Sequence, residues 1–257
     1  MARVDCVVQK FFWYFVLPLI LVVVIWTLFR AHIVAVYGKF LAWMMDIITK
    51  KTAHITRPRK LKLFCELHDV ASANAIAGKP FKIVEIGSGT GVNFDFYPKG
   101  TNVICVDPNP DYGKYLQKNA SRFPDIQLEA VQCGAQDMSL IHDNSVDAVV
   151  GTLVLCSIDD HDIPDVLDEI RRILKPGGKY FYLEHVAAQR GSFTKKFQKF
   201  MQNMQKKFVD NCDVCKETRS FIEEAGFSDL EHQQLWVPEL PRYLFFFKTI
   251  LIGKAQK

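Results

Sequence analysis

Residues 84–91, Val-Glu-Ile-Gly-Ser-Gly-Thr-Gly (VEIGSGTG), place a glycine-rich turn directly behind an apolar run that begins at Phe81. An apolar run that ends in such a turn is typical of a buried strand whose backbone comes close to a ligand. Twenty-two residues after Glu85, Asp107 follows the next apolar run. The stretch therefore predicts a strand, a ligand-binding turn and an acidic residue at the end of the next strand.

Outward from this turn, strand and helix signals alternate, which predicts a parallel sheet covered by helices on both faces. The tail differs, because a helix over 216–225 ends at a glycine and two long strand signals follow it. The predicted strands are 81–86, 102–106, 126–131, 146–152, 179–185, 228–236 and 243–254. The predicted helices between them are 91–98, 111–122, 136–141 and 162–174.

The spacing of the glycines narrows the choice of ligand. In the dinucleotide fingerprint the third glycine follows the second by three positions, but Gly87, Gly89 and Gly91 are two apart and Val92 stands where the third glycine belongs. A Gly-Lys-Ser/Thr sequence is also missing, which excludes a phosphate-binding P-loop. S-adenosylmethionine (SAM) has no phosphate; its ammonium group and its ribose hydroxyls suit Glu85 and Asp107. The pattern therefore favours SAM over a nicotinamide or a nucleoside triphosphate.

At this point a resemblance can be stated. The segments VEIGSGTG, VDPNP, SVDAVVGTLVLCSI, EIRRILKPGGKYFYLEHV and the final IGKA resemble those of class I SAM-dependent methyltransferases. More narrowly, they are similar to the membrane-anchored, methyltransferase-like thiol S-methyltransferases of the endoplasmic reticulum and lipid droplets. The resemblance runs from about residue 60 to the end. It implies a seven-stranded, mostly parallel Rossmann-like sheet whose last two strands form an antiparallel edge pair.

The resemblance also implies a set of site residues. The first SAM motif and the ribose-binding acid are matched directly, and the loop after the third strand is expected to read the adenine. Relatives often carry an acid just before Ala135, where this chain has Gly134, so the adenine contacts follow the family pattern least closely. The expected cofactor-binding residues are Glu85, Gly87, Ser88, Gly89, Gly91, Asp107, Pro108, Asn109, Ala135, Gln136, Asp137 and Thr152.

Two features bear on the methyl acceptor. The fourth strand ends in Thr-Leu-Val-Leu-Cys (152–156) instead of the Asn/Asp-Pro-Pro-aromatic sequence of base-modifying enzymes, which argues against adenine or glutamine N-methylation. His185, at the end of the fifth strand, is the candidate general base; the alternative is a structural histidine. A thiol already forms some thiolate near neutral pH and needs little help from a base, whereas an alcohol needs a strong one. The resemblance, together with the lack of an obvious His/Asp dyad, therefore favours small apolar thiols as the acceptors, and a lipid, sterol or quinone oxygen is the alternative.

The N-terminal region predicts a membrane anchor. Residues 11–29 contain no charge, are bracketed by Lys10 and Arg30, and are long enough to cross the hydrocarbon core as a helix. A signal peptide is disfavoured by the length and by the lack of a small-residue cleavage site, and a buried helix by the apolar character on all sides. Residues 31–48 keep three polar residues seven apart, as in a helix lying in the membrane interface. A spanning helix followed by this interfacial helix and a monotopic hairpin both remain open.

Charge supports the same division. Residues 1–62 carry ten Lys and Arg against two Asp, a balance of +8, and because the whole chain has a net charge of +4, residues 63–257 carry −4. A nucleic-acid-binding domain is therefore not expected. The basic excess suits the anionic cytosolic leaflet and predicts a catalytic domain that faces the cytosol. We predict an anchor, interfacial helix and basic linker over 1–62, with the linker broken at Arg57-Pro58, and a methyltransferase domain over 63–257.

The seven cysteines are an odd number scattered through strands and loops, as in a protein with reduced thiols. Cys212-Asp-Val-Cys215 is a lone CxxC without a second pair at zinc spacing, so no metal site is expected. Residues 193–208 predict a helix with an aromatic and Met face (Phe193, Phe197, Phe200, Met201, Met204 and Phe208). This helix either packs on the sheet or forms a lid over the acceptor pocket that also touches lipid. A catalytically silent membrane protein with the same fold remains the third interpretation.

Overall fold

The computed structural model describes residues 12–257; of Ala31 and Phe208 it describes the backbone alone. The chain divides into two compact units, one ending at Trp43 and the other running from Met44 to Lys257. Phe11 and Lys10, at the start of the predicted anchor, lie outside the described residues.

The first unit is helical throughout its described part. A π-helix, η1 (Phe12–Val16), leads into the long α-helix α2 (Leu17–Ile76). The large apolar side chains between Leu19 and Phe29 are exposed on all sides, and the segment is long and apolar enough to cross a membrane. A helix that exposes apolar side chains all round has no face suited to water.

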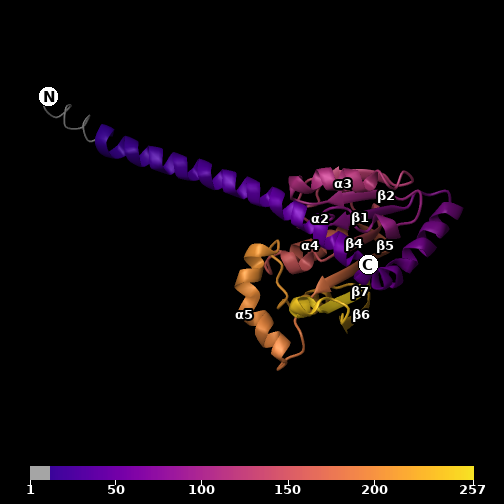
Figure 1. Cartoon of the computed structure of the whole chain (residues 1–257). Helices are drawn as coiled ribbons and strands as arrows, with labels where there is room; N and C mark the ends of the chain where they lie inside the picture. Colours follow the sequence, from indigo (N-terminus) through magenta and orange to yellow (C-terminus); the bar gives the residue numbers. More distant parts are fainter. Residues whose placement is uncertain (1–11) are drawn as a thin grey trace. The chain divides into compact units, whose positions relative to one another are not determined.

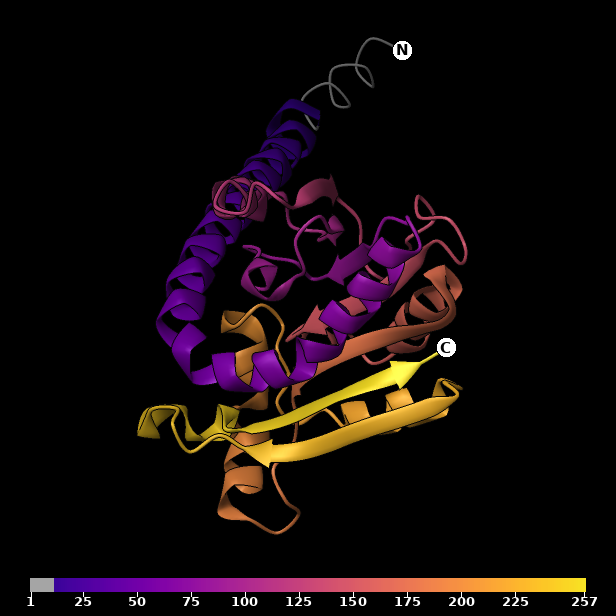
Figure 2. The same ribbon diagram turned by 90° about the vertical axis from the view of Figure 1, so that its right-hand side faces the viewer.

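The second unit begins with the C-terminal part of α2. The predicted break at Arg57-Pro58 is wrong, because Pro58 lies inside the helix. The basic residues around it do not form a solvated linker either. Arg57 forms an ion pair with Asp95. The Arg59 guanidinium donates hydrogen bonds to both carboxylate oxygens of Glu239, each at 3.0 Å. The helix thus continues where the local sequence favours its end, and Figure 2 shows this part of α2 changing direction before it runs beside the sheet.

The sheet has seven strands in the order β3-β2-β1-β4-β5-β7-β6 (Figure 1). β1 to β5 are parallel, and β7 is antiparallel to both β5 and β6, as predicted. The strands are β1 (Lys82–Ile86), β2 (Asn102–Val106), β3 (Gln127–Val131), β4 (Val146–Thr152), β5 (Leu174–His185), β6 (Asp229–Trp236) and β7 (Thr249–Gln256). The fold class is thus the one that the sequence indicates.

The helices are α3 (Gly113–Ala120), α4 (Ile163–Ile173), α5 (Phe193–Phe208) and α6 (Thr218–Glu224), with the 3₁₀ turns η2 (Phe94–Phe96), η3 (Pro110–Tyr112), η4 (Leu155–Ser157) and η5 (Arg242–Phe247). Three predictions fail in detail. The helix predicted over 91–98 is reduced to η2, and the one over 136–141 is a turn. The last strand starts at Thr249 because η5 occupies the aromatic stretch before it. Apolar residues in short runs specify burial, but they do not specify the backbone conformation.

Alternate residues of each strand supply two separate cores. Val84 and Ile86 join the core beneath α4 and α6, whereas Ile83 joins the core beneath α2 and α3. In this second core Phe64 of α2 is almost fully buried, and its ring meets those of Phe96, Tyr97 and Phe181 at centroid distances of 5.9–6.3 Å. Phe64 therefore ties α2 to the central sheet.

We predict that Phe64→Ala lowers the free energy of unfolding by about 3–5 kcal/mol, because it leaves a cavity between α2 and the sheet. Chemical denaturation of the purified protein in detergent measures this loss. Phe200→Ala is the matched control, since Phe200 is 81% exposed and its truncation opens no cavity. Equal effects of the two substitutions would contradict the packing described here.

Candidate functional site

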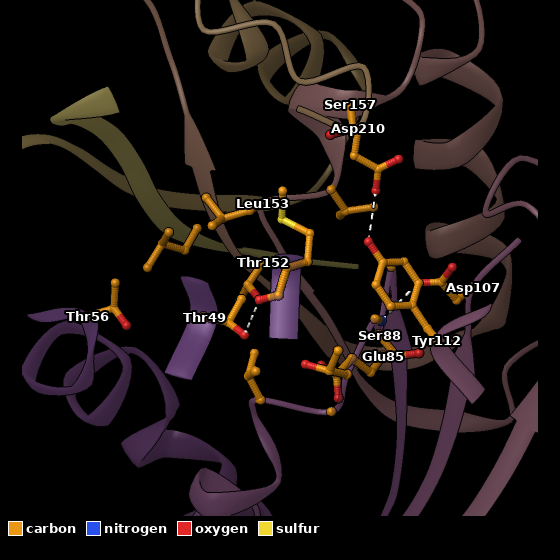
Figure 3. Close-up of a pocket in the computed structure, with 18 of the residues that line it drawn as sticks. Thr49, Thr56, Glu85, Ser88, Asp107, Tyr112, Thr152, Leu153, Ser157 and Asp210 are labelled. Atoms are coloured by element: carbon orange, nitrogen blue, oxygen red, sulfur yellow. Dashed lines mark hydrogen bonds between the residues drawn. The ribbon is translucent and has the colours of Figure 1, made fainter. Parts of the chain in front are cut away.

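A cavity of about 700 Å³ opens at the carboxyl ends of β1, β2, β4 and β5 (Figure 3). The turns that follow these strands supply its floor, and residues of α2 such as Met45 and Thr49 supply one wall. The carboxyl edge is where ligands bind in open α/β sheets, because turns from neighbouring strands diverge there and leave backbone groups free. The cavity is therefore the candidate functional site.

The glycine turn after β1 has the geometry that its sequence predicts. Gly87, Gly89 and Gly91 all have positive φ, between 50° and 74°, which favours glycine. Gly87 also lacks room for a side chain, because a Cβ there would lie 2.4 Å from a methyl carbon of Val154. The turn after β1 thus packs directly against the turn after β4, and its backbone lines the cavity.

Asp107 connects this turn to the end of β2. One of its carboxylate oxygens accepts a hydrogen bond from the backbone N–H of Gly89 at 2.8 Å, and the other accepts from Asn109 at 2.9 Å. Burial raises the pKa of Asp107, and these two hydrogen bonds oppose the shift. These two bonds hold the carboxylate in position at the cavity wall. Its remaining lone pairs are free to accept hydrogen bonds from two adjacent hydroxyl groups of a ligand.

Glu85 lies deeper, in a buried network. Its two oxygens accept hydrogen bonds from the Asn93 amide and the Tyr97 hydroxyl, both at 2.8 Å. The same Asn93 nitrogen also donates to the Thr152 hydroxyl, and the Lys60 ammonium donates to the Asn93 carbonyl oxygen at 2.7 Å. Burial raises the pKa of Glu85 to about 7 and lowers that of Lys60 to about 8. Glu85 therefore couples α2, β1 and β4 at the floor of the site.

The structure brings nearly all of the predicted site residues together. Those that line the cavity are Glu85, Gly87, Ser88, Gly89, Gly91, Asp107, Pro108, Asn109, Ala135, Gln136, Thr152 and His185. Asp137 is the exception, because it is exposed, does not line the cavity, and accepts a hydrogen bond from the backbone of Ser139. It lies in the loop whose sequence departs from the family pattern at Gly134.

Sequence reasoning missed several lining residues. The Tyr112 hydroxyl donates to the Asp210 carboxylate at 3.2 Å across the cavity, joining η3 to the segment after α5 (Figure 3). Leu153 lines the cavity with a positive φ of 60°, a strained conformation that often marks a functional turn. No local motif predicts the Tyr112–Asp210 contact, because the two residues are 98 positions apart and meet only after distant segments have packed.

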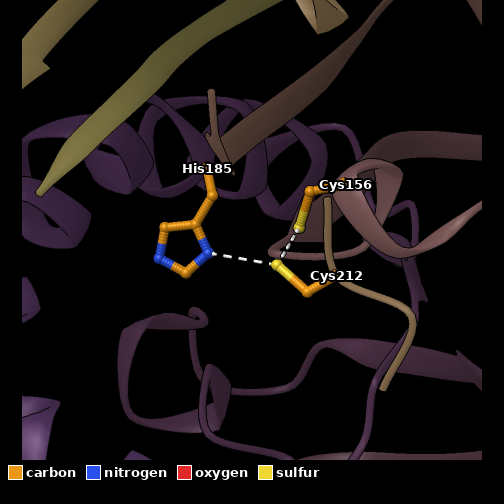
Figure 4. Close-up of side chains that lie close together, drawn as sticks. All are labelled: Cys156, His185 and Cys212. Carbon is orange, nitrogen blue, oxygen red and sulfur yellow. Dashed lines mark hydrogen bonds between the residues drawn. The ribbon is translucent and has the colours of Figure 1, made fainter. Parts of the chain in front are cut away.

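A second group of side chains lies at the ends of β4 and β5 (Figure 4). The Cys212 sulfur is 3.5 Å from the sulfur of Cys156 and 3.7 Å from Nδ1 of His185. The hydrogen bond between the two cysteine sulfurs, more than the contact with His185, lowers the pKa of Cys212 to about 5, and the same bond raises the pKa of Cys156. The partner of Cys212 is therefore Cys156, and Cys215 of the CxxC sequence takes no part in the cluster.

The two interpretations of α5 are now distinguishable. Gln198 is fully buried; its amide accepts from Ala188 and donates to Phe246, and the ring of Phe197 packs on that of Phe245 at 4.8 Å. The cavity is lined by residues 209–212 that follow α5 and by no described side chain of the helix itself. The helix is thus packed on η5 and on the segment that follows β5, and the prediction of a lid is not supported.

Comparisons with known proteins agree with this geometry. A family model described as a methyltransferase domain matches residues 84–182. Human thiol S-methyltransferase TMT1B is 33% identical over 253 residues, covering 93% of this chain and 98% of that protein. Human TMT1A is 36% identical over 181 residues, covering 70% and 72%. A crystal structure of a SAM-dependent methyltransferase from Thermotoga maritima shares the fold, with a TM-score of 0.55 at 19% identity over 86% of this chain and 99% of that one.

We predict that burial of Glu85 makes stability depend on pH. Between its ordinary value of 4.5 and its raised pKa of about 7, the folded state holds a proton that the unfolded chain has released. Stability therefore falls as the pH rises through this window, by about 3 kcal/mol for a group shifted this far. Melting temperatures at about pH 5 and about pH 8 should show a smaller fall in Glu85→Gln than in the unmodified protein.

Glu129→Gln is the control for this experiment, because Glu129 is exposed on β3. Glu184, whose pKa burial also raises to about 7, contributes a fall of the same sign that persists in the Glu85 variant. An unchanged pH dependence in Glu85→Gln would show that Glu85 is charged in the folded protein across the whole range.

Proposed function

The chain belongs to the class I SAM-dependent methyltransferases, and on this premise we propose that it transfers the methyl group of SAM to small apolar thiols at a membrane surface. The observation that carries the proposal is the identity to thiol S-methyltransferases over nearly the whole chain, together with a cavity in which the SAM motif and an apolar wall face the same space. The acceptor and the location are the proposed parts; the cofactor follows from the family.

We place SAM along the turns after β1, β2 and β3. In this arrangement Asp107 accepts hydrogen bonds from the ribose hydroxyls, and the backbone of the glycine turn runs beside the methionine moiety. Glu85 and Thr152 lie near the ammonium group, and Ala135 with Gln136 lies beside the adenine. The buried Glu85 network favours a cationic ligand, because a positive charge at the cavity floor stabilises the ionised carboxylate.

The other side of the cavity suits an apolar acceptor. Its wall includes Leu153, Val154, Ile158, Leu183 and Val209. His185 lies at the end of β5 beside this wall and is the candidate catalytic residue. Methyl transfer from a sulfonium chiefly requires that the nucleophile, the methyl carbon and the leaving sulfur lie in a line. A thiol bound beside His185 could lose its proton there and attack the methyl carbon as a thiolate.

A membrane location is proposed from the first unit and from one face of the second. The apolar helix from Phe12 onward has the length of a membrane span, and the basic residues after it suit a cytosolic leaflet. Phe193 and Phe200 of α5 and Tyr243 of η5 expose at least 74% of their surface, as membrane-contacting aromatics do. We propose the endoplasmic reticulum or lipid-droplet surface as the location, with residues 1–62 as the anchor region, whose part after Met44 also lines the cavity, and 63–257 as the methyltransferase domain.

We predict that SAM raises the melting temperature of the purified protein and that Asp107→Ala removes this effect. A ligand present at about 100 times its dissociation constant stabilises the folded state by about 2.7 kcal/mol. Asp111→Ala is the matched control, because Asp111 belongs to the neighbouring turn η3 but does not line the cavity. A missing shift in the unmodified protein would favour a catalytically silent protein with this fold.

We predict that the protein methylates an aryl or alkyl thiol in strong preference to the alcohol or phenol of the same skeleton. The physical reason is that a thiol supplies its own thiolate near neutral pH. Mass spectrometry after incubation with labelled SAM and matched thiol and hydroxyl acceptors measures this preference. Labelled product from the phenol or a quinol alone would replace the thiol proposal with an oxygen acceptor.

A further inference from the structure

We propose that Cys156, His185 and Cys212 form a zinc site whose fourth coordination position faces the cavity and takes the sulfur of the acceptor thiol. Figure 4 shows the three side chains turned toward one another from η4, the end of β5 and the segment after α5. The CxxC sequence alone predicts no such site, because two of the ligands come from elsewhere in the chain. The role given to the metal rests on the proposed thiol acceptor, whereas the site itself does not.

The distances fit a tetrahedral metal. Zinc bonds to cysteine sulfur at about 2.3 Å and to histidine nitrogen at about 2.0 Å, so two sulfurs on one ion lie about 3.8 Å apart and a sulfur and a nitrogen about 3.6 Å apart. The observed separations are 3.5 Å between the sulfurs and 3.7 Å between the Cys212 sulfur and Nδ1. All three donor atoms lie within 4.8 Å of one another. The Cys156 sulfur and the histidine nitrogen lie within 4.8 Å of each other, so a side-chain shift of up to about 1 Å would complete the geometry.

The chemistry of the donor set also points to zinc. Thiolate and imidazole ligands select soft or borderline ions, and two cysteines with one histidine leave a fourth position open, as catalytic zinc sites do. Burying two thiolates without a counter-charge would cost much free energy. With one divalent ion and a neutral imidazole the site has no net charge. The alternative is a disulfide between the two cysteines. A disulfide would leave the histidine beside them without a role.

The surrounding structure holds the ligands in place. The Glu184 carboxylate accepts hydrogen bonds from the backbone N–H groups of Val154, Leu155 and Cys156 at 3.0–3.1 Å. The backbone N–H of Asp213 donates to the carbonyl of Cys156 at 2.7 Å, which ties two ligand segments together. The Gln205 amide donates to the Cys212 sulfur at 3.8 Å. Hydrogen bonds of this kind orient the ligands of metal sites.

The open position follows from which ligands reach the cavity. His185 and Cys212 line it, whereas Cys156 is buried behind them. A metal among the three therefore presents its fourth position to the same space as the glycine turn and Asp107. An acceptor thiol that binds there releases its proton to solvent, and its sulfur electron pair forms the new bond to the methyl carbon. The bond from that carbon to the sulfonium breaks, and its electrons remain on S-adenosylhomocysteine. In this form His185 is a ligand and not a free base.

The site is tested on the full-length protein, purified in detergent without chelators and without a histidine tag. Elemental analysis by mass spectrometry should find about one zinc per chain in the unmodified protein and a small fraction of that in Cys212→Ser and in His185→Gln. Cys215→Ser is the matched control and should keep its zinc, because Cys215 lies three residues away in the same segment but outside the cluster. Melting temperatures show whether each variant is folded.

Cobalt(II) exchanged into the unmodified protein tests the fourth position without turnover. Tetrahedral thiolate ligation should give visible absorption, and an acceptor thiol added without SAM should increase the sulfur-to-cobalt charge-transfer band. An unchanged spectrum would overturn the open position. Zinc no higher in the unmodified protein than in Cys212→Ser, or a Cys156–Cys212 disulfide in active protein, would overturn the site.

The two proposals fail in different ways. Full thiol methylation by metal-free protein would leave the proposed function standing and remove the role of the metal. A bound metal whose spectrum responds to thiols, in a protein that methylates no thiol, would support the site and contradict the proposed function.

Discussion

The close contact between the turns after β1 and β4 is the constraint on which the site depends. Gly87 has no room for a side chain because Val154 packs against its backbone. Val154 is fixed in turn by Glu184, whose carboxylate holds the N–H groups of three successive residues in the β4 turn. One contact thus joins the cofactor side of the cavity to the side that carries Cys156 and His185. A shift of the β4 turn would therefore move the cofactor side of the cavity relative to Cys156 and His185.

The long helix α2 gives the site a second constraint. Its C-terminal part packs through Phe64 on the central sheet, while Lys60 reaches the Glu85 network and Met45 and Thr49 line the cavity. The wall of the cavity is therefore built from the same helix whose earlier residues have the composition of a membrane span. The α2 residues of that wall are mostly polar or basic, among them Thr49, Thr56 and Lys60, and the apolar part of the lining is supplied instead by Leu153, Val154, Ile158, Leu183 and Val209.

Buried ionisable groups concentrate at this edge of the sheet. Burial raises the pKa values of Glu85, Asp107 and Glu184, and all three carboxyls accept hydrogen bonds from the turns around them. These carboxyls fix the positions of the loops, because a buried carboxylate that accepts hydrogen bonds from several N–H or O–H groups orders the segments that carry those groups.

The sequence by itself determined most of the strands and the glycine turn, because alternation, strand length and positive φ at glycine are local properties. The antiparallel edge pair and most of the predicted cofactor-binding residues followed from the resemblance to class I methyltransferases. Sequence reasoning failed where distant segments decide the outcome. α2 continues through Pro58 and packs on the sheet through Phe64, and the Tyr112–Asp210 contact spans the cavity. Only the tertiary structure showed that Cys212 belongs with Cys156 and His185 and not with Cys215. Side chains separated by 27 and 56 residues meet through the packing of the sheet, and no short motif records that proximity.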